Sequence, residues 1–242
     1  MIFGGDVHTL VRGLAAGDRN GGPIRLALRL YQSCMEQGGF SQEAVFAQYL
    51  DWFHNGAYDT GPTLWAVCSY YTQGYSLEEA VQRQYLLYPS DGVAPAHRAT
   101  PLALFLCGSE LDTALYQESK CTHGSEISAQ VSIMAGRICS YLLQGSKLRD
   151  AIEEAYVGID PAIKVHPKEI SRCSRGGYAP DVLCAALSFL SVYDSFSVAL
   201  EESLRFAGAA NYCPVLVGSI GACLHRHVPL ALLAHPECPD IF

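Results

Sequence analysis

The chain has 242 residues, of which 50% are hydrophobic and 17% charged, and its formal net charge is −8. This core-rich composition excludes an intrinsically disordered protein, and an acidic balance without a basic cluster argues against binding to long nucleic acids. No apolar run approaches the roughly 20 residues that cross a bilayer, and residues 1–9 lack the features of a signal peptide, so we expect a cytoplasmic protein with no membrane contact.

The first half of the chain predicts helices that start at a proline or a capping residue. Pro23 suits a first helical position, Ser41 an N-cap and Pro62 another first position. Residues 76–79 read Ser-Leu-Glu-Glu, the pattern of a capping box. The predicted helices are 23–37, 41–53, 62–72 and 77–85, followed by a loop over 88–97.

The second half continues the helical period and contains no useful alternating strand pattern. The predicted helices are 99–107, 109–118, 126–143, 147–156, 180–192, 195–206 and 214–224. Residues 158–178 have mixed charge, two prolines and a Gly-Gly pair, which predict an irregular excursion. We therefore expect one all-α domain over residues 1–242, a compact orthogonal bundle of roughly ten helices.

Ten cysteines are widely spaced and include no Cys-x-x-Cys pair, which disfavours a zinc ribbon or a thioredoxin-like site. Cys34, Cys68, Cys139 and Cys184 fall on apolar helical faces. We expect them to be small buried side chains in a reducing compartment.

Two polar segments carry a carboxylate at a helix end. In the first, 13–23, the glycines permit close backbone approach, and Asp18 could hold a ligand hydroxyl, orient a water or cap a turn. In the second, 56–62, Asp59 and Thr60 could bind a metal or a polarised water, or serve as an ordinary N-cap.

Two further segments carry histidine, arginine and cysteine. His97 and His123 each lie at a predicted helix start, where a structural hydrogen bond is the plain alternative to a catalytic role. Arg98 beside an apolar helix would suit a phosphate ligand or a buried ion pair. Cys213 precedes an apolar helix whose dipole favours a thiolate nucleophile, although packing or a ligand contact explains it as well.

The ordered set of motifs resembles the ADP-ribosylglycohydrolase family, which includes dinitrogenase reductase-activating glycohydrolase, over residues 12–235. It comprises Gly17-Asp18-x-x-Gly21, Asp59-Thr60, Arg98-x-x-Pro101, Thr122-His123 and Gly218-x-x-Gly221-Ala222. The resemblance implies an all-α fold and hydrolysis of the bond between ADP-ribose C1″ and an acceptor. It also implies two magnesium ions, held by an early Thr-Asp-Asp-Thr loop and a late Gly-Asp-Thr-Asp-Thr loop.

The chain departs from that family pattern at the metal loops. Only Asp59 and Thr60 match the early loop, and Arg25 stands about where a glutamate is often found. The late loop falls on residues 209–214, which contain no Asp or Glu. Because magnesium prefers several hard carboxylate ligands, we expect no binuclear magnesium centre, with at most one weak ion at Asp59, helped by Thr60 or Asp18.

The resemblance leaves three functions open: a hydrolase, a non-catalytic ADP-ribose-binding relative, and a purely structural protein. For the hydrolase, Asp59 is the expected base or electrostatic stabiliser, Asp18 holds water or a ribose hydroxyl, His123 or His97 is the general acid, and Cys213 is a covalent variant. The expected partner is ADP-ribose or an ADP-ribosylated substrate. The expected ligand-binding residues are Gly17, Thr60, His97, Arg98, Thr122, Ala210, Asn211 and Tyr212.

Overall fold

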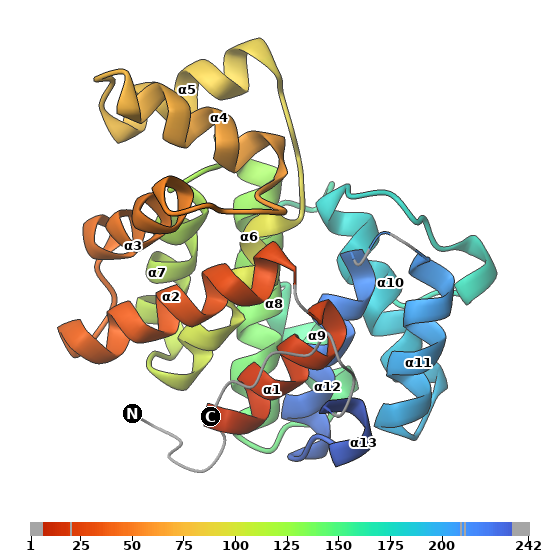
Figure 1. Ribbon diagram of the computed structural model, residues 1–242. Coiled ribbons are helices and arrows are strands. Elements are labelled where there is room, and N and C mark those ends of the chain that lie inside the picture. Colours follow the sequence, from red (N-terminus) through yellow and green to blue (C-terminus); the bar gives the residue numbers. More distant parts are fainter. Residues whose placement is uncertain (1–6, 20, 209, 211, 234–242) are drawn as a thin grey trace.

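The structure is a computed structural model that describes residues 7–19, 21–208, 210 and 212–233. These residues form thirteen α-helices and two 3₁₀ turns, Thr100–Leu104 and Ile170–Arg172, and no β-strand (Figure 1). The helices are α1 (Val7–Asp18), α2 (Gly22–Gln37), α3 (Gln42–His54), α4 (Gly61–Thr72), α5 (Leu77–Leu87), α6 (Ala94–Ala99), α7 (Gly108–Ser119), α8 (Glu126–Leu143), α9 (Leu148–Ala155), α10 (Ala179–Val192), α11 (Phe196–Ala207), α12 (Tyr212–His225) and α13 (Leu230–Leu233).

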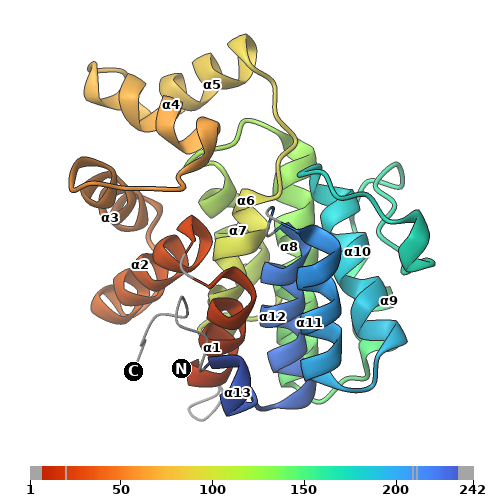
Figure 2. The same ribbon diagram turned by 45° about the vertical axis from the view of Figure 1, so that its right-hand side comes forward.

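The core is built around helices that are apolar on nearly every side. Every residue from Cys213 to Cys223 of α12 is buried, and α10 buries all of Ala179–Leu190 except Asp181. A helix that is hydrophobic all round must be surrounded by other elements. Helix α12 accordingly packs against α1, α8, α10 and α11 (Figure 2).

Glycines allow α1 and α12 to pack with their backbones in contact. A Cβ added to Gly13 would lie 2.3 Å from the carbonyl oxygen of Gly218, and one added to Gly17 would lie 2.1 Å from that of Pro214. Real side chains do not approach so closely, so both positions require glycine. The Gly17 contact places the end of α1, with Asp18, directly beside the start of α12.

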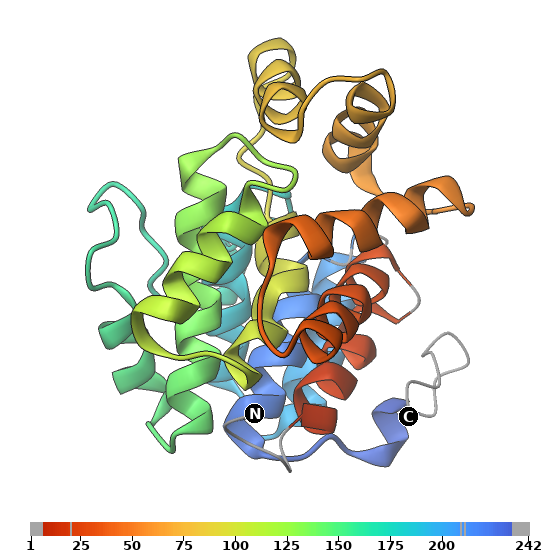
Figure 3. The same cartoon turned by 90° about the vertical axis from the view of Figure 1, so that its left-hand side faces the viewer.

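Helices α4 and α5 form a hairpin that projects from the main body (Figures 1 and 3). Ser76 and Glu79 form the predicted capping box at the start of α5. The segments that enter and leave the hairpin, 55–60 and 88–93, both return to the centre of the molecule. The hairpin therefore brings two polar segments of the sequence to one place.

The structure confirms an all-α fold in a single compact domain, but it moves two predicted boundaries. Residues 13–18 are the end of α1 rather than a loop, because their glycines face α12. Residues 94–97 are helical in α6, with Pro95 in its first turn, so His97 lies inside a short helix. The predicted helix over 126–143 has the same bounds as α8.

Nine cysteines are described, and all nine are free thiols; the tenth, Cys238, lies outside the described residues. Cys34, Cys68, Cys139 and Cys184 are buried as predicted. None of the helices in the described ranges combines the length and apolar content that a bilayer crossing needs.

Candidate functional site

Three of the four polar segments of the sequence contribute residues to one pocket of about 390 Å³. Its walls are the first turns of α4 and α6, the turns before α6, α8 and α10, and the first residue of α12, which gather at the upper centre of Figure 1. The lining residues are Thr60, Gly61, Pro62, Thr63, Leu64, Ser90, Asp91, Gly92, Val93, Ala94, His97, Arg98, His123, Gly177, Tyr178 and Tyr212.

Asp18 and Asp59 meet beside this pocket, at the start of α2. Oδ2 of Asp59 accepts a hydrogen bond from the backbone N–H of Gly22 at 2.8 Å, and Oδ2 of Asp18 accepts one from Ile24 at 2.7 Å. A Cβ on Gly21 would lie 2.4 Å from Asp18 Oδ1 and 2.9 Å from Asp59 Oδ2, so both carboxylates lie close to this glycine. The two side chains thus act as long-range caps of α2.

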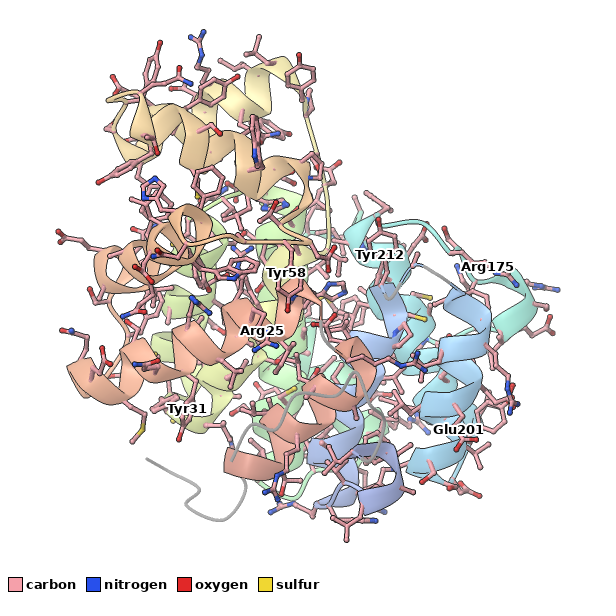
Figure 4. All side chains as sticks on the ribbon, in the orientation of Figure 1. Arg25, Tyr31, Tyr58, Arg175, Glu201 and Tyr212 are labelled. Atoms are coloured by element: carbon pink, nitrogen blue, oxygen red, sulfur yellow. The ribbon has the colours of Figure 1, made fainter. Side chains whose placement is uncertain are left out.

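Burial is the main reason that the pKa of Asp18 rises from 3.8 to about 7. The Ile24 N–H lowers this pKa, nearby Asp59 raises it further, and Arg25 lowers it. Arg25 also donates from Nε to the hydroxyl of Tyr58 at 3.0 Å, across the start of α2 (Figure 4). At neutral pH Asp18 is therefore partly protonated.

His97 links the third polar segment to the fourth. Its Nε2 lies 2.7 Å from the carbonyl oxygen of Tyr212, and the two rings stack with their centroids 6.4 Å apart. A carbonyl oxygen only accepts, so Nε2 carries the proton. Burial lowers the pKa of His97 to about 4, against the opposing effect of the Tyr212 carbonyl.

A buried polar chain runs from Glu118 through Arg98 to His123. Arg98 donates from Nε to Glu118 at 2.5 Å and from Nη2 to Thr122 at 2.7 Å. Thr122 Oγ1 lies 2.8 Å from Nδ1 of His123. Because Arg98 only donates, Thr122 accepts from it and gives its own proton to Nδ1, which leaves Nε2 of a neutral His123 as a donor.

These hydrogen bonds confirm the buried ion pair considered for Arg98. They also leave one N–H donor group of Arg98 without a partner. Arg98 and Glu118 are 1% and 0% exposed. Nη1 of Arg98 and Oε2 of Glu118 have no hydrogen-bond partner among the described residues. Arg98 lines the pocket, and its buried guanidinium retains one group, Nη1, without a partner among the described residues.

The environments of His123 and Cys213 disfavour two of the predicted catalytic roles. Burial lowers the pKa of His123 to about 3, with Arg98 and Lys120 adding to the effect, so an imidazolium acid is scarce at neutral pH. Burial raises the pKa of the Cys213 thiol to about 12, and this side chain is absent from the pocket lining. The dipole of α12 does not overcome that desolvation, so a thiolate nucleophile is not favoured.

The pocket brings together five of the predicted site residues: Thr60, His97, Arg98, His123 and Tyr212. The other described candidates do not line it: Asp18, Asp59, Gly17, Thr122, Ala210 and Cys213. Asp18 and Asp59 instead cap α2, Gly17 packs α1 on α12, and Thr122 orients His123. Asn211 lies outside the described residues.

Sequence reasoning missed the segment Ser90-Asp91-Gly92, which lines the pocket beside His123. A Cβ on Gly92 would lie 3.4 Å from Nε2 of His123. The signal in the sequence is a polar turn with a carboxylate seven residues before Arg98, a pattern that by itself predicts only a loop. Thr63 and Tyr178 also line the pocket and were not predicted.

The donor set does not fit a pair of divalent ions. The described residues contain no group of three or more His, Cys, Asp or Glu side chains that could hold a metal. Both carboxylates at the start of α2 already accept backbone N–H groups, and Asp18 retains its proton in part near neutral pH. Magnesium prefers several ionised oxygens around each ion, and the described residues of this site do not supply them for a pair of ions.

Comparisons with known proteins agree with the resemblance seen in the sequence. The family model described as ADP-ribosylglycohydrolase matches residues 12–236. Among solved structures 44 chains match; one described as an ADP-ribosylglycohydrolase-related protein complex superposes with a TM-score of 0.75 and 19% identity, covering 96% of this chain and 92% of that one. No curated protein sequence matches. At this identity the structural match shows the fold alone.

Proposed function

The chain belongs to the ADP-ribosylglycohydrolase family, and from this premise we propose that it is a hydrolase that cleaves the glycosidic bond at C1″ of an ADP-ribosyl conjugate. The reaction takes place in the pocket between α4, α6, α10 and α12, without the family's usual pair of magnesium ions.

The open donor of Arg98 is the observation that carries this proposal. The Arg98 guanidinium is 1% exposed and its Nη1 has no partner among the described residues. Burying such a donor costs folding free energy unless an anion accepts its hydrogen bond. The N-terminus of α4 lines the same pocket, and its N-cap Thr60 makes no side-chain capping hydrogen bond. Free helix N–H groups and an arginine donor together suit the diphosphate of ADP-ribose.

The remaining walls of the pocket suit a sugar and a base. Its volume of about 390 Å³ lies within the range of small-molecule sites. Tyr212, 39% exposed, and Tyr178, 45% exposed, present aromatic faces, and Thr60, Thr63 and Ser90 present hydroxyl groups for the ribose hydrogen bonds.

Glycosidic cleavage requires stabilisation of an oxocarbenium-like transition state and a positioned water. The neutral His123 can donate from Nε2 but is a poor proton source, because of its low pKa. The carboxylates Asp18 and Asp59 accept N–H groups at the start of α2, and Asp59 directly precedes Thr60 of the pocket lining.

The direct test is release of free ADP-ribose. The purified protein is incubated with conjugates in which ADP-ribose is attached to arginine, to serine, to a nucleic-acid end or to a free metabolite, in EDTA and in about 2 mM MgCl₂. We expect release from at least one conjugate at the same rate in both buffers. Release that requires magnesium would refute the metal-independent site, and no release from any conjugate would refute the hydrolase.

A second candidate function, non-catalytic ADP-ribose binding, is favoured by one observation. The cysteine and histidine side chains of the site are not activated: the thiol of Cys213 is buried and the imidazoles of His97 and His123 are neutral. This candidate predicts a rise in melting temperature with ADP-ribose and no release from any conjugate. A structural protein would show neither.

A further inference from the structure

We propose that Asp91, rather than Asp59, is the catalytic general base of this pocket. The inference rests on the proposed hydrolase function and assigns its reacting carboxylate. Among the sixteen described residues that line the pocket, Asp91 has the only carboxylate.

The structure holds Asp91 from two sides. Its Oδ1 accepts a hydrogen bond from Ser125 Oγ at 2.6 Å, and its carbonyl oxygen accepts one from the backbone N–H of Ala179 at 2.9 Å. Ser125 is the N-cap of α8, where its Oγ also accepts from Ser128 N at 3.1 Å. The side chain of Asp91 is thus held by the start of α8 and its backbone by the start of α10. A preorganised catalytic group requires such fixed positioning.

The second oxygen of Asp91 remains available. Oδ2 accepts no hydrogen bond from the described residues, and the side chain is only half-buried. Asp91 precedes Gly92, whose Cα faces Nε2 of His123. A water held between Oδ2 and the pocket would therefore have an acceptor from Asp91 and a polar neighbour in His123.

Asp59 has a different environment. Its Oδ2 is occupied by the N–H of Gly22, and it lies outside the pocket lining. Asp59 also has φ +51°, in the left-handed region, so its backbone conformation is specialised for turning the chain into α4. Asp59 is therefore an exposed carboxylate that caps α2 outside the pocket lining, whereas Asp91 lines the pocket that the substrate would enter.

The reaction balances with water as the only co-substrate. The water oxygen forms a bond to C1″ while the bond from C1″ to the acceptor breaks, and that electron pair leaves with the acceptor. Asp91 takes the proton of the attacking water and returns it to solvent, and the acceptor takes a proton from solvent. The negative charge of Asp91 also stabilises the oxocarbenium-like transition state.

The test uses Asp91→Asn, which keeps an amide oxygen for Ser125, with Asp160→Asn as a matched control. Asp160 is exposed and lies in the loop after α9, outside the pocket. We expect Asp91→Asn to lower kcat by about 10²–10⁴-fold while KM and the melting shift with ADP-ribose change less than about threefold. The control should match the wild type.

Each other outcome has a distinct meaning. If the wild type turns over and the kcat of Asp91→Asn is within tenfold of the wild-type kcat, the assignment is overturned but the hydrolase function stands. The same holds if Asp91→Asn raises KM and leaves kcat unchanged, because Asp91 would then only hold a ribose hydroxyl. A wild type without turnover overturns both. If Asp91→Asn does not fold, Ser125→Ala tests the same point, because loss of the orienting hydrogen bond should lower kcat about tenfold with ADP-ribose binding retained; an unchanged kcat there overturns the assignment.

Discussion

Replacing Asp18 by asparagine should make the protein more stable above about pH 4, with the full gain reached at about pH 7 and above. The Asp18 side chain is 5% exposed, and burial raises its pKa from 3.8 to about 7. Asp18 therefore binds its proton more tightly in the folded protein than in the unfolded chain. Between about pH 4 and pH 7 the folded state binds more protons, so the free energy of unfolding falls as the pH rises.

The size of the effect follows from the change in pKa. A rise from 3.8 to about 7 corresponds to about 4 kcal/mol, at roughly 1.4 kcal/mol for each pKa unit. Above pH 7 this full amount is lost from the wild type. Asparagine carries no charge at any pH, and its amide oxygen can still accept the Ile24 N–H that Asp18 accepts at 2.7 Å.

Urea denaturation at pH 5, 6, 7 and 8 measures the difference. We expect the Asp18→Asn variant to gain over the wild type as the pH rises, up to about 4 kcal/mol at pH 8, while Asp160→Asn, at an exposed site, shows no such trend. A wild-type stability that does not fall relative to Asp18→Asn between pH 5 and pH 8 would refute the account of a buried, proton-holding carboxyl.

Four further outcomes are expected. Glu118→Gln should destabilise the protein by about 3–5 kcal/mol in urea denaturation, because Arg98 is then buried without its charge partner; a loss below about 1 kcal/mol would contradict the ion-pair reading. Gly17→Ala should cost about 1–3 kcal/mol from overlap with α12, whereas Gly39→Ala, with open space around it, should stay within about 0.5 kcal/mol; equal effects would argue against the close helix contact. Cys213→Ala should leave kcat within about threefold, because a thiol with a pKa of about 12 is not a nucleophile; loss of turnover with retained folding would restore Cys213 as one. About 2 mM MgCl₂ should leave the melting temperature and the calorimetric trace unchanged, and tight binding of two ions would show that other ligands complete a metal pair.

Local chemistry in the sequence predicted the helices and much of the convergence. Prolines at helix starts, the Ser76 capping box and the apolar period defined most elements, because each depends on residues within a few positions. The ordered motifs predicted twelve site residues, and the pocket lining includes five of them: Thr60, His97, Arg98, His123 and Tyr212.

Only the tertiary structure decided what each polar side chain does. Asp18 and Asp59 have the same chemistry as Asp91, yet the fold uses the first two as caps of α2 and leaves Asp91 in the pocket. Burial likewise removed the expected charge from His123 and Cys213 by changing their pKa values. These outcomes depend on desolvation and on partners far along the chain, such as Ser125 for Asp91. Neither can be predicted from the local pattern of residues in the sequence.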